Sequence, residues 1–333
     1  MISPRRLVIT VTKGIIRSMP NKPLVQVDHL TRYYSQTCAV DDVSFNLARG
    51  EVLGFLGPNG AGKSTTMQMI TGNLAPSAGQ ISIDGMDLLD QPKRAKQAIG
   101  YLPEQPPVYR ELTVDEYLQY CARLNRIPRG RIAAAVASAK ERCGLGDVAR
   151  RLIGNLSKGY QQRAGIAQAI IHNPAVVILD EPTVGLDPIQ IREIRSLISE
   201  LGKEHGIILS THILPEVQAT CNRVQIIHHG GLVFSDSTAG MAHRHATTSL
   251  IAVFNNAPNT ERLSQINGVE RVEQLDDGRF RIHYSDTDPA EALAQQAGSQ
   301  QWRLCELTPE RRTLEQIFIE LTCSESPVRE DAA

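Results

Sequence analysis

The segment Gly57-Pro-Asn-Gly-Ala-Gly-Lys-Ser64 holds the clearest chemistry of the chain. Its glycines let successive backbone N–H groups curl around phosphate oxygens, and Lys63 can reach the β and γ phosphates of a nucleotide. The Ser64 hydroxyl suits Mg²⁺. The segment fits G-x-x-x-x-G-K-[ST] and follows the apolar strand pattern Glu51–Leu56, the context that this motif requires. The residues predicted to hold the phosphates are Gly57, Pro58, Asn59, Gly60, Ala61, Gly62, Lys63, Ser64 and Thr65.

Two adjacent acids close a second apolar strand pattern, Val176-Val-Ile-Leu-Asp-Glu181. Asp180 is suited to hold Mg²⁺ through its water shell, and Glu181 to polarise an attacking water. An acidic pair after a strand is by itself usually a solvated turn. Downstream of a phosphate loop, the pair predicts the complementary half of a nucleotide site.

A third motif, Leu156-Ser-Lys-Gly-Tyr-Gln-Gln-Arg163, directly precedes the helical run Ala164–Ile171. Ser157 can cap that helix, and Gly159 lets the backbone approach an anion. A serine and a glycine before a helix are on their own an ordinary cap. Their combination with the two motifs above points to one protein family.

Together, the motifs resemble the nucleotide-binding subunit of an ABC transporter. The family signature, typically LSGGQ, is Leu156-Ser-Lys-Gly-Tyr160 here, similar to ATPases of the ABC-2 exporter branch, including multidrug and gliding-motility-like subunits. Tyr34 matches the aromatic residue that stacks on adenine, Gly185-Leu-Asp-Pro188 the loop that crosses a dimer interface, and His212 the switch histidine that senses the γ phosphate. The resemblance covers residues 24–240 and implies an α/β P-loop NTPase domain with a helical insertion.

The resemblance further implies an ATPase that uses ATP and Mg²⁺ and closes as a head-to-tail dimer. Each copy would place its signature helix on the ATP held by the other copy. An integral membrane permease would be the second partner, contacted by Pro106–Leu112 on the cytoplasmic face of the membrane, and no nucleic acid is expected. The implied nucleotide contacts beyond the phosphate loop are Tyr34, Ser157, Lys158, Gly159, Tyr160 and Asp187; the catalytic residues are Glu181, His212 and Lys63, and the metal ligands Ser64, Glu104 and Asp180.

One position departs from the commonest family pattern. In Gly100-Tyr-Leu-Pro-Glu-Gln105, the family's metal- and water-contacting glutamine aligns best with Glu104 and leaves Gln105 one residue later. A glutamate can bind Mg²⁺ through oxygen, but its charge would add to the carboxylates already near the phosphates. The sequence leaves open which of the two residues does this work.

The motifs lie between segments with strand and helix patterns. The order of these segments predicts an α/β domain with a largely parallel sheet. From Leu24 to Phe45, apolar and polar residues alternate as in short strands. Continuous apolar patterns predict the buried strands Glu51–Leu56, Ala175–Leu179, Gly206–Ser210 and Arg223–Ile227.

Between these strands, Leu112–Leu145 contains only helical patterns. Thr113 with Glu116 three residues later forms a capping box, and Arg131–Arg142 is rich in alanine and other good helix formers. An all-helical insertion is therefore expected.

After Arg244 the pattern changes to that of a small α+β unit. The order βαββαβ followed by a helix predicts a ferredoxin-like domain, with a hairpin turn at Asp277-Gly278 and a final helix, Pro309–Leu321, that places Leu314, Ile317, Phe318 and Leu321 on one face. The predicted elements are Ser249–Phe254, Asn259–Ile266, Val269–Leu275, Arg279–Tyr284, Pro289–Gln296, Gln301–Leu307 and Pro309–Leu321.

Composition limits the other possibilities. The 333 residues suit about two domains; they are 41% hydrophobic with a net charge of −1, which argues against a protein held mainly on nucleic-acid phosphates. No apolar run approaches the ~20 residues of a membrane-spanning helix. The six cysteines lack a CxxC pair and fit a reducing cytoplasm.

The patterns above also predict the domain boundaries. We expect a loose arm over 1–22, with Met19 as an alternative start, and an ATPase domain over 23–244 with a helical subdomain at 106–155. An accessory domain over 245–323 and a tail over 324–333 should follow.

Two other functions compete with the exporter ATPase. A soluble ABC ATPase of translation or DNA repair generally carries two fused nucleotide domains or a long coiled-coil insertion, and the sequence predicts neither. A scaffold that binds ATP without useful turnover is opposed by Lys63, Asp180, Glu181 and His212 together.

Overall fold

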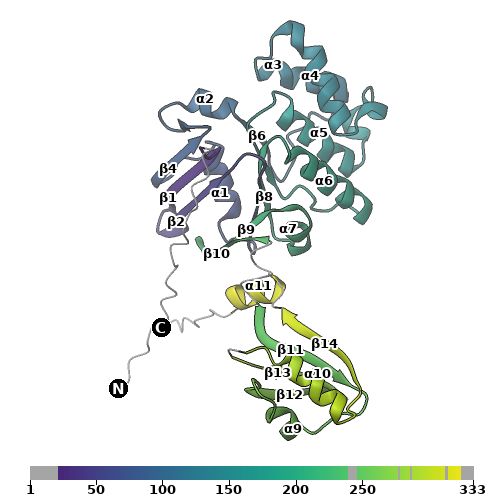
Figure 1. Ribbon diagram of the computed structural model, residues 1–333. Helices are drawn as coiled ribbons and strands as arrows, with labels where there is room; N and C mark the ends of the chain where they lie inside the picture. Colours follow the sequence, from purple (N-terminus) through teal and green to yellow (C-terminus); the bar gives the residue numbers. More distant parts are fainter. Residues whose placement is uncertain (1–21, 239–245, 277, 286, 312–313, 324–333) are drawn as a thin grey trace, which may run out of the picture.

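The computed structural model describes residues 22–238, 246–276, 278–285, 287–311 and 314–323, and Figure 1 shows their arrangement. The predicted arm up to residue 21 with Met19, the tail 324–333 and Asp277 of the predicted hairpin turn lie outside these residues. The six strands of the central sheet are, in spatial order, β10 (Gly231–Ser237), β9 (Arg223–His228), β3 (Val52–Leu56), β8 (Gly206–Thr211), β7 (Val176–Asp180) and β6 (Ile99–Leu102). All neighbours pair in parallel except β10, which is antiparallel to β9 at one edge, so the predicted parallel sheet is confirmed.

The central sheet is buried on both faces, as expected of parallel strands covered on two sides. Successive residues of β7 enter different cores because side chains alternate along a strand. Val177 and Leu179 pack in a core that also holds residues of the helical insertion and of the helices on that face of the sheet. Val176 and Ile178 pack in a second core on the opposite face. The helices that accompany the sheet are α1 (Lys63–Ile70), α2 (Pro92–Gln97), α5 (Lys158–Ile170), α6 (Pro188–Leu201) and α7 (Leu214–Thr220).

A second, antiparallel sheet forms the other wall of the core that holds Val176. Its strands, in spatial order, are β2 (Thr37–Leu47), β1 (Val25–Tyr34), β4 (Ala78–Ile83) and β5 (Met86–Asp87). The hairpin of β1 and β2 confirms the strands predicted from the alternation between Leu24 and Phe45, and its register pairs Tyr34 with Thr37 at the tip.

The predicted helical insertion is confirmed as α3 (Val114–Leu124) and α4 (Arg129–Arg142), followed by two short 3₁₀ turns, Gly146–Val148 and Ile153–Asn155. The capping box forms as expected: the amide of Glu116 donates to Thr113 Oγ1 at 3.2 Å, and the amide of Thr113 donates to the Glu116 carboxylate at 2.8 Å. No helix in the described part of the chain is both long and apolar enough to cross a bilayer.

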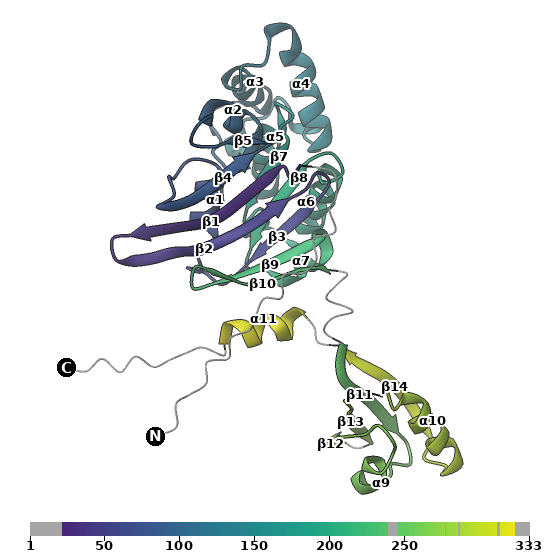
Figure 2. The same ribbon diagram turned by 60° about the vertical axis from the view of Figure 1, so that its left-hand side comes forward.

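The C-terminal unit has the predicted βαββαβ order. Its elements are β11 (Ala246–Phe254), α9 (Thr260–Ser264), β12 (Arg271–Asp276), β13 (Arg279–His283), α10 (Ala290–Ser299) and β14 (Leu304–Arg311). The strands form one antiparallel sheet in the order β12-β13-β11-β14, visible in Figure 2. Leu250, Phe254 and Phe280 anchor its separate core, so the ferredoxin-like expectation is confirmed.

The last helix begins later than predicted. Pro309 belongs to β14, whose pairing with β11 continues to Arg311, and helix α11 covers Leu314–Cys323. Proline favours a helix start, but it is also tolerated in an edge strand such as β14. The pairing of β14 with β11 includes Pro309 and so delays the start of the helix. Ile317 of α11 is buried in the ATPase-domain core and Phe318 packs against it. The side chains of Leu314 and Leu321, predicted on the same face, lie outside the described ones.

Candidate nucleotide-binding and hydrolysis site

Strand order brings the sequence motifs together. Strands β3, β8 and β7 are adjacent and parallel, so their carboxyl ends lie at one edge of the sheet. The phosphate loop follows Leu56 of β3, Asp180 ends β7, and His212 follows β8. Ligands of open parallel sheets bind beyond this edge.

The phosphate loop needs its glycines for close backbone packing. A Cβ at Gly57 would lie 2.5 Å from the carbonyl oxygen of Ile227, and a Cβ at Gly62 would lie 2.5 Å from that of Ala39. Gly62 also has a φ of 108°, a left-handed conformation that side chains disfavour. Helix α1 starts directly after it, at Lys63, so the helix N-terminus faces the loop.

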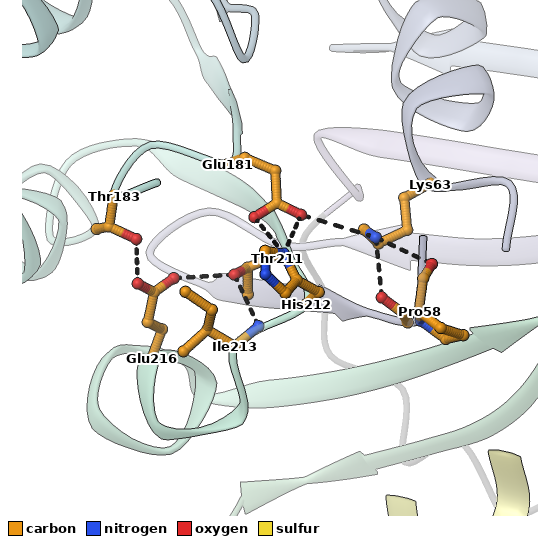
Figure 3. Close-up of polar contacts among 9 residues, drawn as sticks. Pro58, Lys63, Glu181, Thr183, Thr211, His212, Ile213 and Glu216 are labelled. Carbon is orange, nitrogen blue, oxygen red and sulfur yellow. Dashed lines mark hydrogen bonds and ion pairs between the residues drawn. The ribbon is translucent and has the colours of Figure 1, made fainter. Parts of the chain in front are cut away.

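Lys63, Glu181 and His212 form one polar cluster (Figure 3). The Lys63 ammonium donates to the carbonyls of Gly57 at 2.8 Å and Pro58 at 3.2 Å, and lies 3.7 Å from Glu181 Oε1. His212 Nδ1 lies 2.9 Å from Glu181 Oε1 and 3.0 Å from Oε2. The side chains of Lys63 and Glu181 are only 6% and 8% exposed, whereas that of His212 is 42% exposed, so the lysine and the glutamate are buried and the histidine borders solvent.

Glu181 holds a strained backbone conformation. Its φ of 49° is left-handed, which is uncommon for a residue with a long side chain. Its amide donates to the carbonyl of Ser210 on the neighbouring strand at 2.8 Å. Strained backbone of this kind occurs at active sites where the surrounding structure enforces it.

Asp180 offers an unused oxygen to a cation. Its Oδ1 is buried and has no hydrogen-bond partner among the described residues. Burial is the largest cause that raises the pKa of Asp180 above its usual value, because the charged form is poorly solvated there. The hydroxyls of Ser210 and Ser64 oppose this shift, and a nearby cation would oppose it further. The donor set fits Mg²⁺, which prefers oxygen ligands.

The predicted residues divide into two sets. Several of them line one cavity of about 310 Å³. This cavity, which we call the nucleotide pocket, is lined by Ala39, Asn59, Gly60, Gly62, Lys63, Ser64, Thr65, Glu104, Glu181, Val184 and His212. Glu104 is therefore at the pocket, whereas Gln105 is not among its lining residues. Tyr34, the signature residues 157–160 and Asp187 also lie outside the lining.

Tyr34 lies at the tip of the β1–β2 hairpin, and its side chain is 45% exposed. The guanidinium of Arg32 lies 4.9 Å from the centroid of its ring, a cation–π contact. Arg32 also donates to the carbonyl of Ala75 at 3.0 Å. The hairpin thus presents an exposed aromatic ring that is supported from its own strand.

The signature helix α5 begins at Lys158, six residues earlier than the predicted run from Ala164. Ser157 occupies the N-cap position, but its side chain makes no capping hydrogen bond, so that expected contact is absent. The first amides of helix α5 therefore receive no hydrogen bond from the Ser157 side chain. Gly159 is packed so closely that a Cβ would lie 2.6 Å from the side chain of Gln190.

Asp187 has a structural role within its own chain. Its carboxylate accepts from the amides of Ile189 at 3.0 Å and Gln190 at 2.9 Å and so caps helix α6. The loop before it touches the signature, since Gly185 lies against the end of the Lys158 side chain. The predicted interface loop and signature are therefore neighbours.

Sequence reasoning missed a buried polar network beside the pocket. Glu216 of α7 accepts hydrogen bonds from the hydroxyls of Thr183 and Thr211. These residues come from three separate segments. Glu216 belongs to none of the sequence motifs, so nothing in the sequence around it marks it as part of the network. Only the order of β7, β8 and α7 in space brings them together.

Comparison with known proteins extends these observations. Residues 40–184 match the family model "ABC transporter", and residues 243–322 match "ATP-binding protein DrrA1-3-like, C-terminal domain". The chain is 40% identical over 218 residues to the ABC transporter ATP-binding protein NatA of Bacillus subtilis, covering 65% of this chain and 89% of that protein.

Another relative matches over nearly the whole length. It is an uncharacterized ABC transporter ATP-binding protein of Bacillus subtilis, YdbJ, 31% identical over 304 residues, which cover 90% of this chain and 96% of the relative. A solved structure, the dimeric ATP-binding cassette MJ0796 bound to ADP and Pi, shares the fold with a TM-score of 0.58 and 23% identity, over 64% of this chain and 98% of the other.

The phosphate loop, Glu181 and His212 line one pocket on an ABC-type α/β fold, and a DrrA-like domain follows it. The match to YdbJ, over 304 residues, extends through both parts. The chain belongs to the ABC transporter ATP-binding family, whose members hydrolyse ATP to power transport.

Proposed function

We propose that this chain is the ATPase subunit of an ABC-2-type exporter and that two copies close head to tail around ATP. The observation that carries the proposal is the separation of the site into two parts. Lys63, Glu181 and His212 share the nucleotide pocket, whereas Ser157 lies outside it at a helix start without a capping side chain. A helix N-terminus attracts phosphate, so a second copy can complete the site. The DrrA-like domain supports the exporter branch.

In the closed dimer, the residues of the pocket would divide the work of hydrolysis. The phosphate loop amides and Lys63 bind the β and γ phosphates, and Lys63 exchanges its contacts with the Gly57 and Pro58 carbonyls for them. Glu181 accepts the proton of the attacking water. His212, already within 3.0 Å of that carboxylate, holds the γ phosphate and the base in one geometry. Tyr34 offers its exposed ring to adenine.

Three residues of this chain fit Mg²⁺. Asp180 has a buried oxygen without a hydrogen-bond partner, and Ser64, with its hydroxyl, and Glu104, with its carboxylate, line the nucleotide pocket. Within the described ranges, no group of three or more His, Cys, Asp or Glu residues is arranged to hold a metal by itself. That agrees with Mg²⁺, which is usually bound by one or two carboxylates together with substrate phosphates. When bound there, Mg²⁺ would offset the negative charge of the nucleotide phosphates.

Glu104 rather than Gln105 is expected to contact the metal. Glu104→Ala should lower ATP turnover by about 10- to 100-fold and raise the Mg²⁺ concentration needed for half-maximal rate. Glu104→Gln keeps an oxygen ligand and should lose less. Gln105→Ala, one residue outside the lining, is the matched control and should resemble the wild type. Phosphate release measured across a Mg²⁺ titration tests this. If Gln105→Ala abolishes turnover and Glu104→Gln does not, the assignment is wrong.

The permease is proposed to contact the segment Pro106–Leu112, which follows the pocket residue Glu104 and leads into α3. Tyr109 of this segment is 45% exposed, and its ring packs against those of Tyr117 and Tyr120. This short segment joins Glu104 to an exposed aromatic surface, so it is the proposed route by which a change at the pocket reaches the permease. This contact would hold the chain on the cytoplasmic face of the membrane.

A membrane partner is expected to co-purify with the chain. A tagged copy, recovered from native membranes in mild detergent, should bring down a polytopic membrane protein at comparable stoichiometry. Tyr109→Ala should weaken that recovery, whereas Glu181→Gln should retain it, because Glu181 lies inside the pocket. Recovery only from the soluble fraction, together with ribosomes or DNA, would instead favour a non-transport ABC ATPase.

A further inference from the structure

Three buried polar side chains beside the nucleotide pocket take no part in the chemistry proposed above. Thr183, Thr211 and Glu216 are 3%, 0% and 1% exposed. One oxygen of the Glu216 carboxylate accepts from the Thr183 hydroxyl, and the other accepts from the Thr211 hydroxyl at 2.9 Å. Figure 3 shows the carboxylate lying between the two threonines.

The two threonines lie on the two segments that carry the catalytic pair. Thr183 is two residues after Glu181, and Thr211 directly precedes His212. Since His212 Nδ1 contacts the Glu181 carboxylate, the contacts form a closed ring through both segments and Glu216. The ring has one link inside the pocket, between His212 and Glu181, and two links outside it, through Glu216.

Thr211 also fixes the turn around the histidine. Its Oγ1 accepts from the amide of Ile213 at 3.1 Å while its hydrogen points to Glu216. The residues on both sides of His212 are therefore held by one hydroxyl. Buried hydrogen bonds of this kind are costly to leave unmade, so the carboxylate restricts both segments to one arrangement.

We propose that Glu216 is a positioning residue for ATP hydrolysis: by binding Thr183 and Thr211, it holds the backbone segments of Glu181 and His212 at the separation at which base and histidine act together. This inference rests on the roles proposed for Glu181 and His212. Glu216 itself lies outside the lining of the pocket. Its loss should therefore affect the rate of the chemical step more than the binding of the nucleotide.

Glu216→Met removes both acceptor oxygens at similar side-chain volume. We expect kcat for ATP to fall by about tenfold to a hundredfold, as small misplacements of catalytic groups do, with KM within about twofold of wild type. Gln218→Met, at an exposed position of the same helix, is the matched control and should leave both constants unchanged. A kcat equal to wild type, or a raised KM with unchanged kcat, would overturn the proposal.

Two milder variants guard against misfolding of Glu216→Met. Thr183→Val and Thr211→Val each delete one hydroxyl at constant shape and remove one of the two links. Each should lower kcat and leave KM unchanged, and Thr183→Val combined with Glu216→Met should cost less than the sum of the single effects, because Glu216→Met already breaks the contact that Thr183→Val removes. Additive effects, or a lowered melting temperature with unchanged kcat in all variants, would assign Glu216 to stability alone.

The same assay separates this inference from the proposed site. If Glu181→Gln retains turnover, the assignment of the base fails. If Glu181→Gln abolishes turnover while Glu216→Met, folded by circular dichroism, does not reduce it, only the positioning role fails.

Discussion

The Glu181→Gln variant is expected to bind ATP as the wild type does and to hydrolyse it about 10² to 10⁴ times more slowly, the usual contribution of a general base. The change keeps the shape of the side chain and removes its ability to accept a proton from water. Glu181 is buried beside Lys63 and His212, whereas Glu104, the other carboxylate that lines the pocket, is exposed, so Glu104 is not expected to replace Glu181 as the base. The variant should therefore accumulate as an ATP-bound dimer, visible by size-exclusion chromatography in the presence of ATP and Mg²⁺.

The control is Glu200→Gln, which makes the same change at an exposed position of α6. It should match the wild type in phosphate release. If Glu181→Gln also matches the wild type, another group activates the water, and the scaffold interpretation of the site gains support. Loss of ATP binding in Glu181→Gln would show that the carboxylate maintains the phosphate loop through its contact with Lys63 rather than acting as a base.

The pocket could be predicted from the sequence because each of its motifs is local. The glycines of the phosphate loop, Asp180 with Glu181, and His212 all directly follow apolar strands, and a strand end before a polar turn is visible in one sequence. What the sequence leaves undetermined is the order of the strands. The adjacency of β3, β8 and β7 places the motifs in one pocket, and this adjacency depends on long-range pairing.

The features that escaped prediction depend on tertiary contacts. Glu216 meets Thr183 across 33 residues of sequence, and nothing near either residue marks the pairing. Pro309 has the local character of a helix start, yet β14 pairs with β11 and extends through it. Ser157 has the character of an N-cap, yet its side chain does not bond to the helix. In the first two cases, long-range contacts determine the outcome.

The N-terminus of the signature helix, at Ser157, is exposed and has no capping side chain. If it binds the ATP of a second copy, mixing two inactive variants should restore ATP turnover. Lys63→Ala removes the phosphate-binding ammonium, and Ser157→Arg fills the exposed start of the signature helix. Each should be inactive alone, because each spoils both sites of its own homodimer. In a mixed dimer, the intact phosphate loop of one copy meets the intact signature of the other, so an equimolar mixture should regain about a quarter of the wild-type sites.

The matched control is a mixture of Lys63→Ala with Glu181→Gln. Both residues line the same pocket of one copy, so neither site of their mixed dimer is complete and no turnover should return. Phosphate release measured against the mixing ratio distinguishes the two cases. Recovery in the first mixture alone requires that the signature acts across the dimer, whereas no recovery from copies shown to exchange would mean that each chain completes its own site. In that event the exposed Ser157 would need another partner, and the head-to-tail dimer would be abandoned.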